Sequence, residues 1–195
     1  YEGKERLSMG TVPNEFIYIE NRPGNPYGQI YGYDYVYDAN GNIMVDNIGF
    51  PVATDEMVAL GNLNPDFMAG LSNHVRYKNI NLSFLIDAQV GGEYFSQSAV
   101  YGDLYGTGAS SLEGRKEWYA THGGANNAEE IPGVFPDGYI VEGVNMETGA
   151  VNDTPVDPMM RAVEVSYFRK IMHDYIMDAT NVRLREVVLA YQLPG

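Results

Sequence analysis

The chain has 195 residues, of which 45% are hydrophobic and 12% aromatic, so it is large enough to fold around a core and is not expected to be disordered. Its formal net charge of −14 excludes nucleic acid as an expected partner, because a protein that neutralises phosphates needs clustered lysines and arginines. It has no cysteine, which excludes disulfides, thiol nucleophiles and zinc sites made of cysteine. The 22 glycines and 16 tyrosines beside short apolar runs indicate strands joined by turns.

The first predicted strand is the short segment 16–20, and it is followed by 29–38, where tyrosine occupies every second position. In one continuous strand these tyrosines would line one face of a sheet. They are Tyr31, Tyr33, Tyr35 and Tyr37. Such a row could line a path for a ligand, although packing within the sheet is the simpler interpretation.

Asp38-Ala39-Asn40-Gly41 follows that segment and predicts a hairpin turn, because Asn-Gly readily takes positive φ at both central positions. Residues 43–46 would form the return strand. The same letters superficially resemble a calcium-binding loop, but the glycine stands at position four rather than six. No glutamate follows at the required position, so the turn is the preferred interpretation and no metal site is expected.

Two long strands with alternating apolar and polar side chains are predicted next. Phe67–Tyr77 and Ile80–Tyr94 each keep this alternation, and only Lys78-Asn79 separates them, which fits a tight hairpin. Ordinary strands have about five or six residues, whereas a transmembrane strand needs about 9–11. Tyr77 and Tyr94 lie near opposite ends of the apolar face, as in the aromatic girdles of membrane barrels. A long hairpin in a soluble β-sandwich would alternate in the same way, so the pattern alone leaves both architectures open.

The polar positions of these strands form a face that would line the lumen of a barrel. The titratable and amide side chains expected there are His74, Arg76, Asp87, Gln89 and Glu93. Leu85 is an apolar exception on the same face. The assignment follows from alternation and not from any ligand motif, and His74 is expected to be solvated rather than to bind a metal.

The alternation breaks between about 96 and 174, a stretch rich in Gly, Asn, Asp and Pro. A poorly patterned stretch of this length is unusual within a compact soluble domain, whereas outer-membrane barrels have long extracellular loops. Residues 110–120 have helical propensity, with Ser111 placed to cap the helix. Aromatic residues of this stretch are candidates for contact with a substrate or a protein partner, because they stack on sugars and anchor interfaces. These candidates are Tyr101, Tyr105, Trp118 and Tyr119; the alternative for Trp118 is that it packs the short helix onto the rim of the barrel.

The last predicted strand, 179–193, alternates imperfectly. The residues expected to share one face are Arg183, Arg185, Val187, Leu189 and Tyr191. If the strand crosses a membrane, the arginines must lie near an aqueous end or against a loop, because arginine facing the centre of the bilayer costs about 2–4 kcal/mol. We count about six or seven strands, too few to close a wide barrel. Because open sheet edges do not survive in lipid, we expect these residues to be part of a larger barrel and not to fold alone.

Several short motifs follow one another in a fixed order. They are Gly61-Asn62-Leu63-Asn64-Pro65-Asp66-Phe67, Arg76-Tyr77-Lys78-Asn79, Leu82-Ser83-Phe84-Leu85-Ile86-Asp87, Gly91-Gly92-Glu93, Asp178-Ala179-Thr180-Asn181-Val182-Arg183-Leu184-Arg185-Glu186-Val187 and Leu193-Pro194. This ordered set resembles the SusC/RagA family of TonB-linked outer-membrane transporters. Residues 26–46, with GQIYGY and DANGNI, are similar to the family's stretch ahead of these motifs. The departures are small: Leu63 replaces the usual Pro, and Thr180-Asn181 replaces the usual Ser and its apolar neighbour.

The resemblance implies an all-β fold, in which antiparallel strands form a fragment of a 22-stranded transmembrane β-barrel with long extracellular loops and a short loop helix. Residues 1–195 would be a partial β-barrel domain from the C-terminal half of the barrel. Its long extracellular loop would span approximately 96–174, and the plug domain would be absent. The family imports nutrient oligomers, glycans or peptides, across the outer membrane of Gram-negative bacteria. A SusD-like surface lipoprotein and the TonB complex are the implied partners, the latter through regions absent from this chain, and membrane lipid or lipopolysaccharide would surround the barrel.

No constellation of catalytic residues stands out, so we expect a transport protein and not an enzyme, with no cofactor. His74, His122 and His173 lack the spacing of a zinc motif, and Ser96 and Ser98 lack a placed base. The alternative function is a soluble or surface β-sandwich module that binds carbohydrate. In that case a second sheet would cover the apolar face of residues 67–94.

Overall fold

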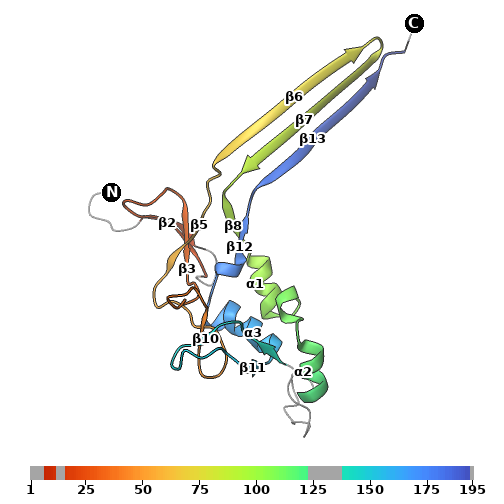
Figure 1. Cartoon of the computed structure of the whole chain (residues 1–195). Helices are drawn as coiled ribbons and strands as arrows, with labels where there is room; N and C mark the ends of the chain where they lie inside the picture. The colour runs from red at the N-terminus through yellow and green to blue at the C-terminus, as the bar shows by residue number, and fades with distance from the viewer. Residues whose placement is uncertain (1–6, 12–15, 123–137, 194–195) are drawn as a thin grey trace.

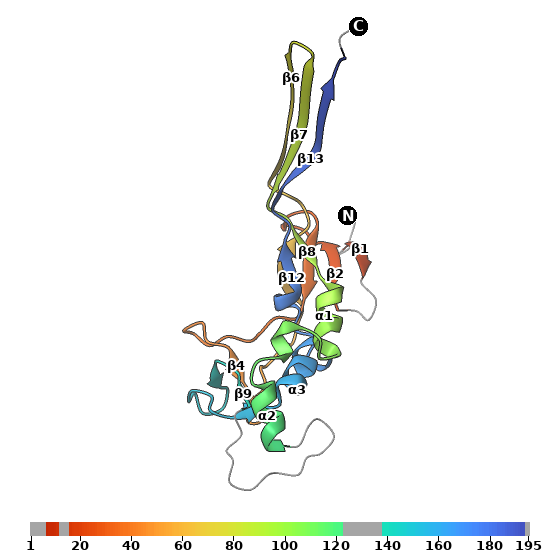
Figure 2. The same ribbon diagram turned by 90° about the vertical axis from the view of Figure 1, so that its right-hand side faces the viewer.

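A computed structural model describes residues 7–11, 16–122 and 138–193. These residues form an elongated molecule in which a long three-stranded sheet projects from a folded unit (Figures 1 and 2). We call residues 67–90 and 181–193 the arm, and the other described residues, apart from 63–66, 91–92 and 179–180, the head. Most of the regular structure is β-strand and the helices are short, which confirms the all-β expectation in its general form.

The arm consists of β6 (Phe67–Tyr77), β7 (Ile80–Val90) and β13 (Asn181–Tyr191), in the order β13-β7-β6 with antiparallel pairing throughout. The predicted tight hairpin is confirmed, because Tyr77 pairs with Ile80 across the two-residue turn. Lys78 takes a φ of 52° in that turn. The second strand ends at Val90 rather than Tyr94.

The head contains the remaining elements. Its strands are β1 (Leu7–Thr11), β2 (Tyr18–Asn21), β3 (Gln29–Gly32), β4 (Met44–Val45), β5 (Val58–Asn62), β8 (Glu93–Phe95), β9 (Tyr139–Ile140), β10 (Val144–Asn145), β11 (Pro155–Val156) and β12 (Ile176–Asp178). Its helices are α1 (Gln97–Leu104), η2 (Ala109–Ser111), α2 (Arg115–His122), α3 (Pro158–Val163), the π-helical η3 (Glu164–Phe168) and η4 (His173–Tyr175). Strands β1-β2-β3-β5 form an antiparallel sheet, and β8 pairs with β12. No helix among the described residues is both long enough and apolar enough to cross a bilayer.

The head has a hydrophobic core that joins segments from both halves of the chain. Phe16, Ile17 and Ile30 come from the first half, and they pack with Val100, Met172 and Tyr175 of the second. Much of the stretch 96–174, predicted as a long extracellular loop with a short helix, thus folds onto residues 16–66. Its apolar residues are spaced irregularly along the chain, so no helical or strand period marks them.

Helix α2 begins at Arg115, so the prediction that Ser111 caps this helix is wrong. Ser111 lies instead in η2, is fully buried, and donates a hydrogen bond to the carbonyl oxygen of Gly108 at 2.7 Å. The Arg115 side chain donates to the Ser111 hydroxyl and also to the carbonyl oxygen of Gly106, at 2.7 Å in the latter case. The buried serine thus belongs to a turn before α2 that hydrogen bonds from Arg115 stabilise.

The row of four tyrosines predicted for 29–38 does not lie along one strand. Strand β3 ends at Gly32, and a register shift separates Ile30 from Tyr31. Beyond it, Tyr33 bridges Ile171 and Tyr35 bridges Ala53. Tyr31 and Tyr35 are buried in the head, whereas Tyr37 is 43% exposed, so the four tyrosines do not form one face of a sheet.

The predicted turn at 38–41 is confirmed, although its geometry differs from the expectation. Gly41 takes a φ of 85°, whereas Asn40 does not have positive φ. The Asp38 carboxylate accepts hydrogen bonds from the Asn42 side chain and from the backbone nitrogens of Asn42 and Asn40. These bonds, led by that from the Asn42 side chain, hold the pKa of the carboxyl below its usual value. The aspartate thus organises the turn itself.

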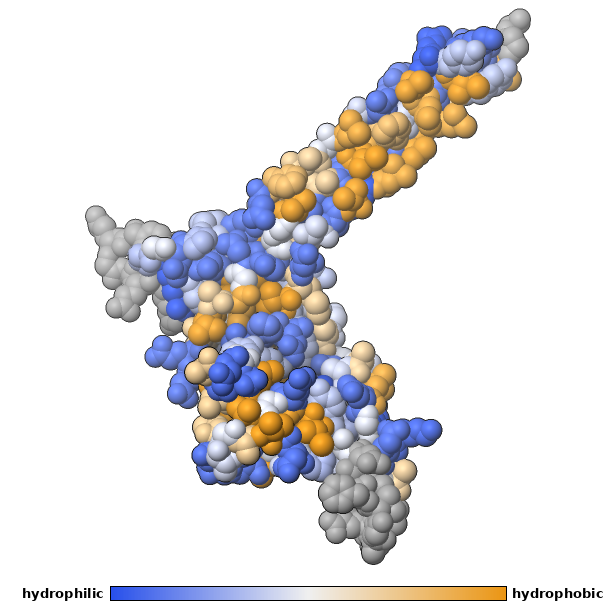
Figure 3. Space-filling model, in the orientation of Figure 1, coloured by the Kyte–Doolittle hydropathy of each residue, from blue (hydrophilic) through white to orange (hydrophobic). Residues whose placement is uncertain are grey.

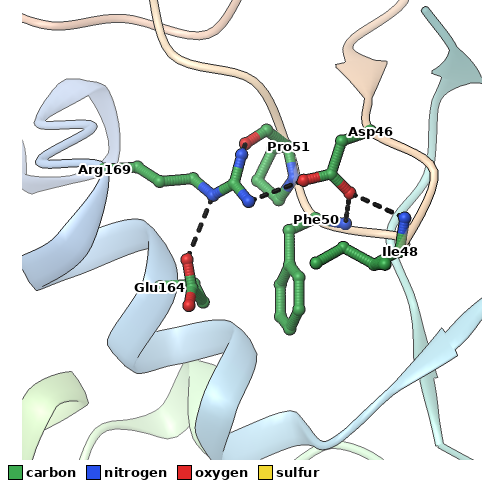
Figure 4. A network of polar contacts seen from close by, with 6 residues as sticks. All are labelled: Asp46, Ile48, Phe50, Pro51, Glu164 and Arg169. Carbon is green, nitrogen blue, oxygen red and sulfur yellow. Dashed lines mark hydrogen bonds and ion pairs between the residues drawn. The ribbon is translucent and has the colours of Figure 1, made fainter. Parts of the chain in front are cut away.

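Arg169 joins η3 to the loop after β4 (Figure 4). Its guanidinium donates to Asp46 at 2.6 Å, to Glu164 at 3.2 Å and to the carbonyl oxygen of Pro51 at 3.0 Å. Asp46 in turn accepts a hydrogen bond from the backbone nitrogen of Phe50 at 3.0 Å. All three charged groups are about three-quarters buried, so their attraction is screened less than that of a surface pair.

Three chain crossings connect the arm to the head, and we call residues 63–66, 91–92 and 179–180 the neck. Gly91 and Gly92 take φ values of 74° and 78°, a conformation that interrupts the strand and lets the chains approach closely. Hydrogen bonds tie the crossings together: Asp66 N donates to Val90 O, Gly91 N to Thr180 Oγ1 and Ala179 N to Gly92 O, each at 2.9 Å. The head is therefore attached to the arm by several linked segments.

We expect Gly92→Ala to destabilise the intact protein more than Gly24→Ala. Both glycines have φ near 80°, so both variants incur the cost of left-handed backbone, about 1–2 kcal/mol. A Cβ atom at Gly92 would also lie 3.1 Å from the Leu63 oxygen and 3.2 Å from the Pro65 nitrogen, whereas at Gly24 it would meet nothing within 4 Å. The additional loss should be roughly 1–3 kcal/mol. Thermal unfolding in detergent, followed by circular dichroism, measures it, and equal losses for the two variants would contradict the close packing of the neck.

Candidate functional site

A β-bulge at Arg185 sets the two faces of the arm. Leu184 pairs with Ile86 and Glu186 with Leu85, so β13 has one residue more than β7 at this point. An extra residue reverses which face the following side chains occupy. The prediction that Arg183 and Arg185 share a face with Val187, Leu189 and Tyr191 is therefore wrong, because the bulge separates the arginines from those apolar residues.

The register places the apolar side chains of all three arm strands on one face (Figure 3). It contains Phe67, Ala69, Leu71, Asn73, Val75 and Tyr77 of β6, Ile80, Leu82, Phe84, Ile86, Ala88 and Val90 of β7, and Val182, Leu184, Val187, Leu189 and Tyr191 of β13. Asn73 is the polar exception. No described element packs over this face, and its outer positions are strongly exposed: Leu184 is 62% exposed and Leu189 71%. Seventeen positions over three strands thus form a continuous apolar surface that faces solvent.

The opposite face of the arm is polar and carries a charged cluster near the neck. Asp87 of β7 forms an ion pair with Arg185. Arg183 is the direct cross-strand neighbour of Asp87, but its Nε donates to Asn181 Oδ1 at 2.6 Å. On its other side Asp87 faces Gly70, which has no side chain. This arrangement leaves a hollow of about 340 Å³ in the polar face.

The structure brings together two of the five residues predicted to line a lumen. Asp87 and Gln89 border the hollow, whereas His74 and Arg76 lie on the same polar face toward the hairpin turn. Glu93 lies outside the arm, in β8, where its Oε2 accepts a hydrogen bond from the Asn62 backbone nitrogen at 2.6 Å. Arg183 and Arg185 were missed as lining residues, because they had been grouped on one face with Val187, Leu189 and Tyr191.

The four aromatic residues proposed for substrate or partner contact fall into two pairs. Tyr101 of α1 and Tyr105, which follows the helix, stack with their ring centroids 6.2 Å apart, and Tyr105 is 70% exposed. Trp118 lies against Gly138, because a Cβ atom placed on that glycine would be 2.7 Å from the indole ring. The Tyr119 hydroxyl contacts Met159 Sδ at 3.7 Å. Trp118 and Tyr119 therefore pack α2 within the head, while Tyr105 is presented to solvent.

Two tyrosine–aspartate hydrogen bonds link distant parts of the head. The Tyr35 hydroxyl donates to Asp174 at 2.5 Å, and the Tyr175 hydroxyl donates to Asp103 at 2.7 Å. Burial, assisted by the aspartate beside each hydroxyl, raises the pKa of both tyrosines well above the ordinary value. His173 Nδ1 lies 3.2 Å from Asp34 Oδ1 in the same region. The contacts of His173 and Asp174 fix these residues against the first half of the chain, and the Tyr175 bond fixes that residue to α1. No sequence motif marks these contacts.

The described residues contain no group of three histidine, aspartate or glutamate side chains that could hold a metal ion. Asp46, Asp87 and Glu164 are instead engaged with arginines, and Asp103 and Asp174 accept hydrogen bonds from tyrosine hydroxyls. The arm offers an apolar surface on one face and a polar, charged surface on the other.

Comparison with known proteins gives an informative similarity to a receptor. No family model matches the chain. The chain is similar to the TonB-dependent receptor P3 of Formosa agariphila, with 24% identity over an alignment of 210 positions. The alignment covers 96% of this chain and 18% of that receptor, so the chain spans less than a fifth of the length of its relative.

We expect Tyr35→Phe to weaken the head at neutral pH, and its difference in stability from the wild-type protein to shrink in alkaline solution. Loss of a buried hydrogen bond to a carboxylate should lower the free energy of unfolding by about 1.5–3 kcal/mol at neutral pH. Because folding raises the pKa of the Tyr35 hydroxyl, the stability it contributes is complete below pH ~10 and decreases above it, as the unfolded tyrosine ionises. The wild-type protein should therefore lose stability more steeply above pH ~10 than the variant.

Urea unfolding of the intact protein at pH 7 and over the range from about 9 to 11 measures both effects. Tyr27→Phe is the control, since that side chain is 63% exposed. If Tyr35→Phe and Tyr27→Phe behave alike at every pH, the Tyr35–Asp174 bond does not stabilise the head.

Proposed function

We propose that this chain is part of the β-barrel of a TonB-dependent outer-membrane transporter of the SusC/RagA type, in which the arm strands cross the membrane. The observation that carries the proposal is the continuous apolar face of β6, β7 and β13, which no described element covers. A face of this kind is costly in water and is the expected surface of a strand sheet in lipid. The similarity to a TonB-dependent receptor and the motifs of the SusC/RagA family support the same assignment.

The dimensions of the arm fit this role. Each of its strands has 11 residues. At a rise of about 3.3 Å per residue and a tilt of 35–45°, such a strand covers a height of roughly 25–30 Å, close to the ~25 Å apolar band of outer-membrane barrels. Tyr77 and Tyr191 lie at one end of the apolar face and Phe67 at the other, where aromatic girdles would meet the interfaces.

The two ends of the arm differ in a way that suggests its orientation. One end has the two-residue turn Lys78-Asn79, and the other end carries the whole head. Outer-membrane barrels have short periplasmic turns and long extracellular loops. The head would therefore lie outside the cell, formed jointly by the segment before β6 and the segment between β7 and β13.

The outer edges of β6 and β13 lack strand partners within the described chain. Backbone groups left open in lipid are strongly unfavourable, so neighbouring strands from the rest of the protein would pair with both edges. We propose that they complete a 22-stranded barrel, with residues 1–195 as one part of it and the plug domain outside this chain. The polar face, with His74, Arg76, Asp87 and Gln89, would then line the lumen.

The proposed cargo is a nutrient oligomer, a glycan or a peptide, and the proposed partners are a SusD-like surface lipoprotein and the TonB complex. Support for these comes from the family resemblance. The exposed Tyr105 and its stacked neighbour Tyr101 offer a surface in the head for substrate or lipoprotein.

No covalent chemistry is assigned to the chain, which we propose is not an enzyme. A soluble carbohydrate-binding sandwich would need a second sheet over the apolar face of the arm, and the described head packs at the end of the arm instead.

Fractionation of cells that produce the intact protein tests the proposal directly. We expect the protein in the outer-membrane fraction, solubilised only by detergent and purified together with a lipoprotein. Recovery as a soluble monomer without detergent would overturn the barrel assignment. Recovery from the outer membrane without a lipoprotein would retain the barrel and reject the SusD-like partner.

We expect Phe84→Arg and Ser83→Arg to differ sharply, although the two residues are adjacent. Phe84 lies on the apolar face between Asn73 and Val187, whereas Ser83 lies on the polar face between His74 and Val188. Arginine facing mid-bilayer lipid costs about 2–4 kcal/mol, and arginine facing an aqueous lumen costs little. Urea unfolding in lipid vesicles, followed by heat-dependent gel mobility, compares the variants. Similar losses for both would contradict a lipid-facing apolar side.

A further inference from the structure

The hollow in the polar face of the arm combines positive charge with open space. Asp87 is its single carboxylate, and two arginines face that carboxylate, so the cluster of Arg183, Arg185 and Asp87 has a net charge of +1. The hollow exists because Gly70 lies beside Asp87: a Cβ atom there would already be 3.7 Å from Asp87 Oδ1, and a larger side chain would fill the space. Its volume of about 340 Å³ is at the lower end of the range for small-molecule sites.

The two arginines have different roles in this cluster. Arg185 is held by Asp87, which neutralises it in part. Arg183 uses its Nε to bond Asn181, and in the part of the chain that the structure describes no carboxylate lies within ion-pair distance of its guanidinium. Its terminal nitrogens are therefore available as a planar pair of donors, the geometry that suits carboxylates and sulfates. The amide of Gln89 lies at the same hollow and can donate further.

The positive charge of this cluster lies in an arm of net positive charge, whereas the rest of the chain is strongly acidic. The arm carries Arg76, Lys78, Arg183 and Arg185 against Asp87 and Glu186, a net charge of +2, whereas the rest of a chain with net charge −14 must carry −16. An acidic remainder of this size repels a polyanion at long range. A ligand with one anionic group on an otherwise neutral body would meet little repulsion and would still gain the contact with Arg183.

We infer that this hollow binds a single anionic oxygen group, a carboxylate or a sulfate ester, on a solute that moves along the polar face. The inference rests on the proposed function, because it takes the polar face as the wall of the solute path. A lipid headgroup is not the ligand, since the hollow opens on the face opposite the apolar side. The bulge at Arg185 belongs to the site, because it turns the second arginine toward Asp87.

Binding of radiolabelled inorganic sulfate to the intact protein in uncharged detergent, measured by equilibrium dialysis, tests the site without knowledge of the natural solute. We expect Arg183→Gln to weaken sulfate binding about tenfold, as for loss of a charged hydrogen-bonding partner. Arg76→Gln is the matched control: it removes the same charge from the same face, opposite Asn81 and away from the hollow, and should leave binding unchanged. Asp87→Asn should strengthen binding several-fold, because it raises the net charge of the cluster from +1 to +2.

Acetate should compete with sulfate if the site accepts carboxylates, and lack of competition would restrict the ligand to sulfate esters. Absence of sulfate binding by the wild-type protein, equal losses in Arg183→Gln and Arg76→Gln, or weaker binding by Asp87→Asn would each overturn the inference. These outcomes are separate from the transport proposal, since a protein that fractionates with the outer membrane and fails to bind sulfate refutes the anion site alone.

Discussion

The extra residue at Arg185 determines which side chains share a face in the arm. Side chains in a strand alternate with a period of two, so the apolar positions of β13 before and after this point could not share a face without a bulge. With it, Val182 and Leu184 continue the surface formed by Val187 and Leu189. Without it, half of the apolar face of β13 would be interrupted and Arg183 would lie among apolar neighbours. One irregularity in hydrogen bonding therefore gives both the apolar face and the charged cluster opposite Gly70.

The head is held by a different kind of interaction. Its two halves come from segments on either side of the arm hairpin. Side chains of each half form hydrogen bonds and ion pairs with polar groups of the other half. Arg169 satisfies Asp46, and Asp174 accepts from Tyr35. Such pairs are partly buried, so breaking one would leave a charge or a hydroxyl without a partner, which costs more than the pair contributes. The hydrophobic cluster around Phe16 and Met172 supplies the apolar part of the same junction.

A structural feature could be predicted from the sequence where the residues that form it are close together along the chain. The hairpin β6–β7 was predicted with its turn and both faces, because its pairing partners are adjacent and its alternation is regular. The bulge left a readable trace: the apolar positions of the last strand change from even numbers, Val182 and Leu184, to odd numbers, Val187 and Leu189. In contrast, no sequence pattern indicates how the described part of 96–174 folds. Val100 and Met172 pack against residues that are far away along the chain, so their contacts are visible only in the structure. Glu93 was assigned to the polar face because alternation was extended across Gly91 and Gly92, where the strand in fact stops.

The pairing of distant segments in the head constrains the order in which the chain can fold. The Tyr35–Asp174 bond closes a loop of 139 residues, and the Arg169–Asp46 pair closes one of 123. Contacts this far apart along the chain form slowly, because most of the entropy of loop closure is lost before any contact is gained. The hairpin β6–β7, in contrast, needs only its own two strands and a two-residue turn. Residues 16–66 must therefore remain without their main packing partners until residues 165–175 have been synthesised, although a complete hairpin separates the two segments.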